Sequence, residues 1–65
     1  MTPQAKRILA SVKNSYPSGH HIQALSFHLD IPEPSIRRCI GEIYRDRSSK
    51  YYLEIQNGIV RAYRG

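Results

Sequence analysis

The chain has 65 residues, enough for one small domain, because a chain of this length buries only about 60% of the surface that it exposes when unfolded. A single cysteine excludes an internal disulfide, and no apolar stretch approaches the roughly 18 residues of a membrane span, so we expect a soluble protein. Ten Lys and Arg against five Asp and Glu give a net charge of +5, which favours a polyanionic partner, nucleic acid before anionic membrane.

The first predicted helix covers about residues 3–15. Thr2 can cap its amino end, and Pro3 has no amide hydrogen to leave unpaired in the first turn. Its apolar residues recur at helical spacing: Ala5, Ile8, Leu9 and Val12. The proline and glycine of segment 16–19 end this helix, and residues 20–22 can form a short extended segment.

Two further helices are predicted at about residues 21–29 and 33–46, separated by a tight connection. Pro32 stops the second helix, and Pro34 fits the first turn of the third. Both helices have an apolar stripe, formed by Ile22, Leu25 and Leu29 in one and by Ile36, Ile40 and Ile43 in the other, with Cys39 beside them.

A β-hairpin is predicted from strands at about 51–56 and 59–64. Asn57-Gly58 supplies the positive φ angles of a two-residue type I′ turn. This turn fixes a register whose predicted pairs are Ile55 with Val60, Leu53 with Ala62, Glu54 with Arg61, and Tyr52 with Tyr63. The expected fold is mainly α with a small β-hairpin (an α+β class), in one domain over residues 1–65.

The segment LSFHLDIPEPSIRRCI, residues 25–40, resembles a helix-turn-helix core, although Asp30 stands where a glycine often occupies the turn. The order helix, helix-turn-helix, hairpin resembles the winged-helix family, particularly its small phage and prokaryotic members. The resemblance implies a DNA-binding protein, either a sequence-preferring transcriptional regulator or an architectural factor, with the third helix in the major groove. It also implies a cytoplasmic, nucleoid-associated location in a bacterial cell or a phage-infected host.

Basic and small residues are the candidates for DNA contact. On the third helix, an arginine can hold guanine through two hydrogen bonds, and a glycine permits close approach to the groove. The candidates on this helix are Ser35, Arg37, Arg38, Gly41 and Arg45. The candidates for contact with the backbone or minor groove, mostly on the hairpin or wing, are Gln23, Lys50, Gln56, Asn57, Gly58, Arg61 and Arg64. The alternatives are that Arg37 and Arg38 are solvated surface charges and that Arg61 is paired with Glu54.

Two other partner classes fit the same features. An acidic protein could bind the basic surface, since a fold does not fix a function. Tyr52 and Tyr63 could stack on the bases of RNA or single-stranded DNA, although a cross-strand pair with a structural role explains them better. A homodimer is also compatible with the sequence, because one small domain covers little DNA.

The sequence indicates neither an enzyme nor a cofactor. No Ser-His-Asp arrangement or phosphate-binding glycine loop is present, and the five acids are scattered. His20, His21, His28 and Cys39 lack the paired spacing of structural zinc sites, so no metal is expected.

Overall fold

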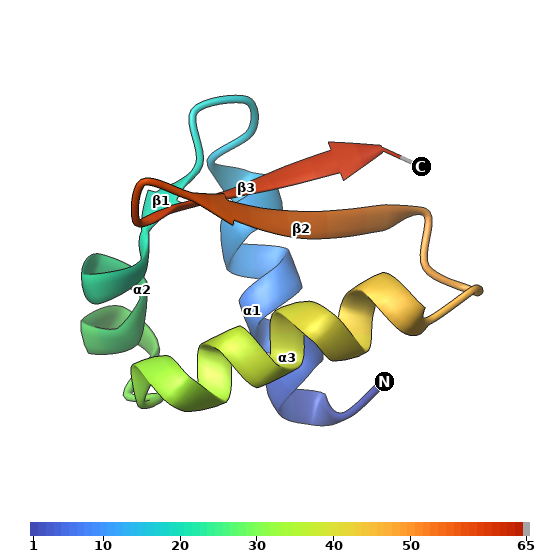
Figure 1. Cartoon of the computed structure of the whole chain (residues 1–65), viewed down its shortest axis with the longest axis horizontal. Helices are drawn as coiled ribbons and strands as arrows, with labels where there is room; N and C mark the ends of the chain where they lie inside the picture. The colour runs from blue at the N-terminus through green and yellow to red at the C-terminus, as the bar shows by residue number, and fades with distance from the viewer. Residues whose placement is uncertain (65) are drawn as a thin grey trace.

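The computed structural model describes residues 1–64, in which three helices pack against a three-stranded antiparallel sheet (Figure 1). Gly65, the last residue of the predicted domain, lies outside the described residues. The elements in chain order are α1 (Pro3–Asn14), β1 (His20–His21), α2 (Ile22–Leu29), α3 (Glu33–Arg45), β2 (Tyr51–Gln56) and β3 (Ile59–Arg64). All lie within one residue of the predicted boundaries.

The helix ends are set by local hydrogen bonds and backbone angles. The Thr2 hydroxyl accepts the Ala5 N–H at 3.2 Å, which confirms the predicted cap of α1. His21 is extended, and its Nδ1 accepts the Gln23 N–H at 3.2 Å, so α2 begins at Ile22. At the end of α3, Asp46 leaves the helical region, with φ −82° and ψ 103°.

The connection between α2 and α3 is held by three features. Asp30 adopts the left-handed conformation, with φ 56° and ψ 45°, in agreement with the expectation that aspartate tolerates this geometry. The Ser26 hydroxyl donates to the Ile31 carbonyl at 2.6 Å, and the Arg7 guanidinium donates to the Leu29 carbonyl at 3.3 Å. These contacts fix the angle at which α3 leaves α2.

The hairpin has the predicted turn and register. Asn57 and Gly58 have positive φ angles of 54° and 79°, and every predicted cross-strand pair is present. The sequence did not predict that β1 pairs with β3, which makes a sheet of order β1-β3-β2. A two-residue strand is too short to show an alternating pattern, so this third strand could not be recognised from periodicity.

One apolar core lies between the helices and the inner face of the sheet. It consists of Ala5, Ile8, Val12, Ile22, Leu25, Ile31, Ile36, Cys39, Ile43, Leu53, Val60 and Ala62. Leu29 and Ile40, which we expected in the buried stripes, are only partly buried because they lie at the margin of this core. Within residues 1–64, no helix is long and apolar enough to span a bilayer.

Candidate nucleic-acid interface

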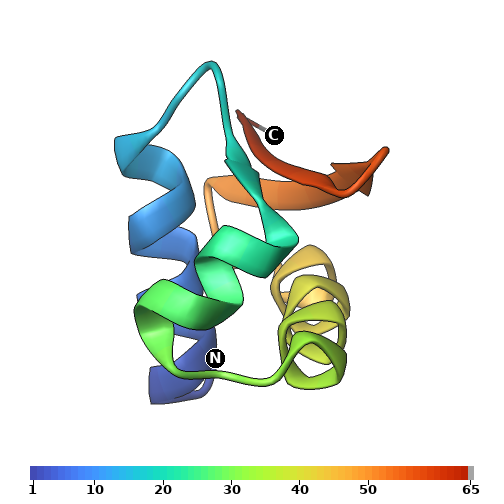
Figure 2. The same ribbon diagram turned by 90° about the vertical axis from the view of Figure 1, so that its left-hand side faces the viewer.

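Helix α3 turns one side toward the core and leaves the other free. Its buried residues are Ile36, Cys39 and Ile43. Since successive residues are turned by about 100°, the side opposite this stripe is formed by Pro34, Arg38, Gly41 and Arg45. Figure 2 looks along α3 and shows that no other element covers its outer side. A partner can therefore approach most of the length of this 13-residue helix.

Arg37 and Arg38 lie on different parts of the exposed surface. Arg38 is on the outward side of α3, in line with Arg45 two turns later. Arg37 is turned by about 100° from Arg38 and shares a flank with Tyr44. Ser35 is half-buried on the opposite flank, where its N–H donates to the Pro32 carbonyl at 3.0 Å. The α3 residues that the sequence predicts to contact DNA therefore do not lie in one row along the helix; they form a band across its exposed surface.

The arginines of α3 have no partner within the described chain. Arg37, Arg38 and Arg45 are all exposed, and among residues 1–64 none of them forms a hydrogen bond or an ion pair. Three solvated guanidinium groups on one short helix create a local positive potential that favours an anionic partner. Each retains all five of its N–H donors for that partner.

Gly41 lies in the middle of this basic side with open space around it. Apart from its chain neighbours and the backbone of α3 itself, no atom of residues 1–64 lies within 4 Å of the position that a Cβ at this residue would occupy. Glycine inside a helix costs about 1 kcal/mol relative to alanine. Packing within the fold therefore gives no reason for a glycine here.

A shallow groove runs between α3 and β2, and it brings together predicted residues from the helix and the hairpin. Gly41 and Arg45 line one side, and Gln56 lines the other. Tyr44, which the sequence did not single out, also lines this groove. The groove joins the outward side of α3 to the hairpin, so a ligand lying along α3 would also meet β2.

The turn of the hairpin is packed against α2. The Gly58 carbonyl accepts the Ile22 N–H at 2.7 Å, and a Cβ at Gly58 would lie 2.9 Å from Nε2 of His21. Asn57 and Gln23 are exposed beside this contact. Three residues predicted to contact the DNA backbone therefore lie together at one end of the molecule: Gln23 of α2, and Asn57 and Gly58 of the turn that α2 holds.

The other predicted basic residues are spread over several surfaces. Arg61 lies on the outer face of the sheet opposite Glu54, and the two form no ion pair in the described structure. Arg64 has the opposite orientation on β3 and lines a hollow with Lys13 of α1. Lys50 is exposed in the loop that follows α3. The structure therefore places Arg64 apart from the α3 surface.

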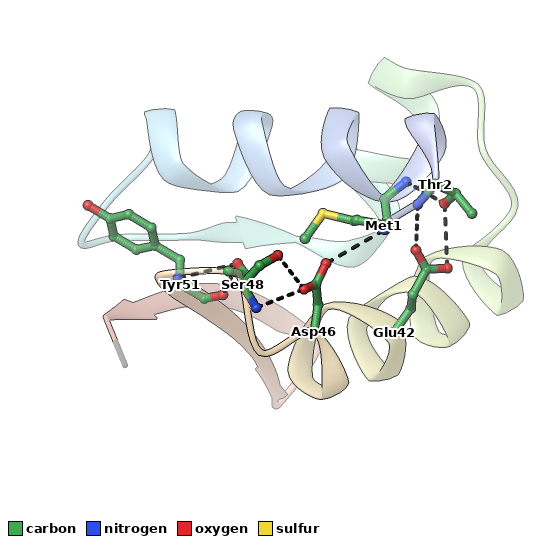
Figure 3. A network of polar contacts seen from close by, with 8 residues as sticks. Met1, Thr2, Glu42, Asp46, Ser48 and Tyr51 are labelled. Carbon is green, nitrogen blue, oxygen red and sulfur yellow. Dashed lines mark hydrogen bonds and ion pairs between the residues drawn. The ribbon is translucent and has the colours of Figure 1, made fainter.

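A polar network holds the carboxylates of Glu42 in α3 and of Asp46, the residue that follows α3 (Figure 3). The Thr2 N–H donates to Oε2 of Glu42 at 2.7 Å, and the amino group of Met1 lies 3.6 Å from Oδ2 of Asp46. Asp46 also accepts hydrogen bonds from the Ser48 hydroxyl and N–H, which lower the pKa of its carboxyl group below the ordinary value. The Glu42 carboxylate therefore contacts Thr2, and the Asp46 carboxylate contacts Met1 and Ser48. Neither carboxylate forms an ion pair with an arginine of α3 in the described structure.

Three tyrosines link α3 to the outer face of the sheet. The Tyr52 and Tyr63 rings stack with centroids 5.5 Å apart, as expected for a cross-strand pair. Tyr44 meets Tyr52 edge-on at 5.7 Å and remains 67% exposed. The signal for Tyr44 in the sequence was its place one helical turn after Ile40 and Gly41, on the flank that faces β2.

The remaining reactive side chains have structural surroundings. Cys39 is buried and its thiol donates to Oε1 of Gln4 at 3.6 Å, while burial, followed by the charge of Glu42, raises its pKa. The His20 and His28 rings meet edge-on at 6.3 Å. Among residues 1–64, no three His, Cys, Asp or Glu side chains converge in a metal-binding arrangement.

No family model, curated protein or solved structure matches the chain. The interpretation of the site therefore rests on its geometry and charge.

Proposed function

We propose that this protein binds duplex DNA as a small winged-helix domain, with α3 in the major groove and β2 and the hairpin turn beside the phosphate backbone. The observation that carries the proposal is that Arg37, Arg38 and Arg45 are exposed on α3 and have no hydrogen-bond or ion-pair partner within residues 1–64. An α-helix with its side chains is about 10–12 Å wide, which fits the major groove of about 12 Å.

The three arginines suit different contacts. Arg38 and Arg45, on the outward side, are the candidates for hydrogen bonds to base edges, where guanine O6 and N7 can accept two N–H donors of one guanidinium. Arg37, on the flank toward the hairpin, is the candidate for a phosphate contact. This division changes the expectation from the sequence, which treated Arg37 and Arg38 as equivalent.

The hairpin supports this arrangement through its fixed position. Its turn is hydrogen-bonded to α2, so Gln56, which lines the groove, and the adjacent turn residue Asn57 are held in place before any ligand binds. An interface that is already ordered loses less conformational entropy on binding. The role proposed is that of a regulator or architectural factor.

A salt titration with three single variants tests the proposal. Fluorescence anisotropy with a labelled mixed-sequence duplex is measured for wild type and for Arg38→Ala, Arg37→Ala and Arg64→Ala. We expect log affinity to fall linearly with log salt, and each α3 variant to bind about 5- to 100-fold more weakly. If Arg37 contacts a phosphate, Arg37→Ala lowers the salt slope by about 1.

Arg64→Ala is the matched control, because it removes the same charge from a different surface. It should change affinity by much less than Arg38→Ala. Equal losses in the two variants would mean that binding follows net charge alone. The absence of duplex binding at low salt would contradict the proposal.

Two competitors decide among the partner classes. Unlabelled single strands of the same sequence should displace the duplex poorly, since Tyr52 and Tyr63 already stack on each other. A polyglutamate peptide of matched charge represents an acidic protein surface. Displacement by single strands, or by polyglutamate at equal charge concentration, would favour the corresponding alternative over duplex DNA.

A further inference from the structure

A small hollow lies beside the carboxyl end of α1, where the strands β2 and β3 meet at the end away from their turn. Its volume is about 220 Å³, and the side chains that line it are Lys13, Tyr16, Tyr51 and Arg64. None of these residues belongs to α3, and none takes part in the DNA contacts proposed above. Arg64, which the sequence grouped with the wing, therefore belongs to a separate feature of the surface.

The fold fixes the positions from which these side chains converge. Tyr51 and Arg64 are direct cross-strand partners, so their side chains leave the sheet on the same face. Lys13 is in the last turn of α1, and its Nζ lies 4.3 Å from the centre of the Tyr51 ring. The Tyr16 N–H donates to the Lys13 carbonyl at 3.1 Å, which holds Tyr16 beside the end of the helix. Figure 3 shows Tyr51 pointing away from the polar network around Asp46.

The hollow has two positive charges and no acidic side chain in its lining. Within residues 1–64, neither Lys13 nor Arg64 forms an ion pair. Two cations that line one hollow repel each other, and an anion between them removes this repulsion. A phosphomonoester carries about −1.5 to −2 charges at pH 7, which matches two cations, whereas a carboxylate carries only one negative charge. An arginine can also hold two phosphate oxygens through parallel N–H donors. The charges therefore favour a phosphate group.

The rest of the lining is aromatic. The Lys13 ammonium occupies one side of the Tyr51 ring, whereas Tyr16 is 61% exposed and leaves its ring open to a ligand. A nucleic-acid base of any kind can stack on such a ring. The volume is below the roughly 300–1,000 Å³ of pockets for drug-sized ligands, so the hollow admits one phosphate and one ring system.

We propose that this hollow binds a free nucleoside monophosphate, with the phosphate between Lys13 and Arg64 and the base stacked on Tyr16. The Tyr51 ring positions the Lys13 ammonium for this contact. Because the side chains that meet the ligand are exposed, we expect weak binding, with a Kd of about 1 mM. The site lies on a different surface from α3, so its existence does not depend on DNA binding.

The test follows the whole chain in ¹⁵N NMR titrations without DNA, at constant ionic strength. The probes are adenosine 5′-monophosphate, adenosine and inorganic phosphate, each added to about 10 mM, or about ten times the expected Kd. We expect the monophosphate to cause saturable shifts at residues 13–16, 51 and 64, and not at the amides of α3. It should bind at least about fivefold more tightly than either adenosine or inorganic phosphate, because only the monophosphate makes both contacts.

Variants of α1 and of the segment after it separate the contributions of charge and ring. Lys13→Ala should weaken binding of the monophosphate about tenfold. Lys6→Ala is its matched control, since it removes the same charge from an exposed residue of the same helix, and should have little effect. Tyr16→Ala should weaken binding of the monophosphate about fivefold or more and leave binding of inorganic phosphate unchanged. Tyr16→Phe keeps the ring and should bind as wild type does.

Two arginine variants distinguish this hollow from the proposed DNA surface. Arg64→Ala should weaken binding of the monophosphate about tenfold and keep most of the affinity for duplex DNA, whereas Arg38→Ala should do the reverse. If the wild-type protein binds no duplex, the comparison of the two variants with the monophosphate still tests the hollow.

Several results would overturn the proposal. No saturable shifts at the highest concentration, equal affinity for adenosine or inorganic phosphate, or an equal loss in Arg38→Ala would each contradict it. A 5′-phosphorylated dinucleotide that binds much more tightly than the monophosphate would replace a free nucleotide with the end of a nucleic-acid strand as the ligand. Thermal melts of each variant verify folding, which substitution of exposed side chains should preserve.

Discussion

Replacement of Gly41 by alanine should make the protein more stable and make it bind DNA more weakly. Gly41 is an interior residue of α3, and its φ angle is not in the left-handed region. Beyond the neighbouring residues and the backbone of α3, nothing in residues 1–64 lies within 4 Å of the added methyl group, so the substitution introduces no clash with another element. The two effects have opposite signs because one depends on the chain alone and the other on its partner.

The gain in stability follows from helix propensity. Alanine is favoured over glycine by about 1 kcal/mol inside a helix. Part of this difference arises because the unfolded chain has less conformational entropy with alanine than with glycine, so less entropy is lost on folding. For a domain of this size, 1 kcal/mol corresponds to a rise in Tm of about 4–8 °C. Thermal melts and urea titrations followed by circular dichroism measure the change.

The loss of affinity follows from the proposed approach of DNA to the open space at Gly41. Forcing one extra methyl group into a well-packed contact costs about 1–3 kcal/mol, which corresponds to about a 5- to 150-fold loss of affinity. Anisotropy titrations with the duplex used for the arginine variants measure it. The salt slope should stay the same, since no charge is removed.

Ala10→Gly provides the control, because Ala10 is exposed on α1 and the change reverses the same chemistry. It should lower stability by about 1 kcal/mol and leave affinity unchanged. A Gly41→Ala protein that binds DNA as tightly as wild type would refute the close approach at this residue. A variant with no gain in stability would refute the assignment of open space around it.

Three further predictions concern the fold. Gly19→Ala should destabilise the protein by more than about 2 kcal/mol in urea titrations, because φ is +83° and the new Cβ would lie 2.5 Å from the Val60 carbonyl oxygen; near wild-type stability would contradict this. Cys39 should react with a disulfide reagent much more slowly than a free thiol at neutral pH, since burial raises its pKa, and fast labelling of the native protein would disprove it. Hydrogen bonds from Ser48 lower the pKa of Asp46, so its contribution to stability is present above its ordinary pKa of 3.8 and lost as the pH falls below that value; Asp46→Asn should flatten the change in urea midpoint in that range, and an unchanged pH profile would contradict it.

The hairpin was predictable because its determinants are adjacent in the sequence. Asn57 and Gly58 require a turn whose geometry fixes every pair of the two strands. The helix boundaries were predictable for the same reason, since Thr2, Pro32 and Pro34 act within one turn of their own positions.

Features that depend on distant residues were missed or only partly described. The pairing of β1 with β3 joins segments almost forty residues apart, and no local pattern reports it. The contact of Thr2 with Glu42 is of the same kind. Arg64 was grouped with the hairpin because of its place in the sequence, whereas alternation along β3 turns it toward α1.

The candidate site was predictable in composition but less so in geometry. A sequence pattern does not indicate whether an arginine is free or paired, and the structure shows that the α3 arginines have no partners among residues 1–64. Nor did composition distinguish an exposed aromatic residue from a buried one. Phe27 and Tyr44 both fit a helical pattern, and only the packing of α2 and α3 shows that they face solvent.

The order of the strands also determines when the chain can fold during synthesis. The central strand of the sheet, β3, follows β1 and β2 in the chain, and within residues 1–64 both of these strands pair with it and not with each other. Until β3 emerges, β1 and β2 lack their hydrogen-bonding partner and the core lacks Val60 and Ala62. The nascent helices therefore cannot complete a stable core on their own, and folding awaits the synthesis of β3.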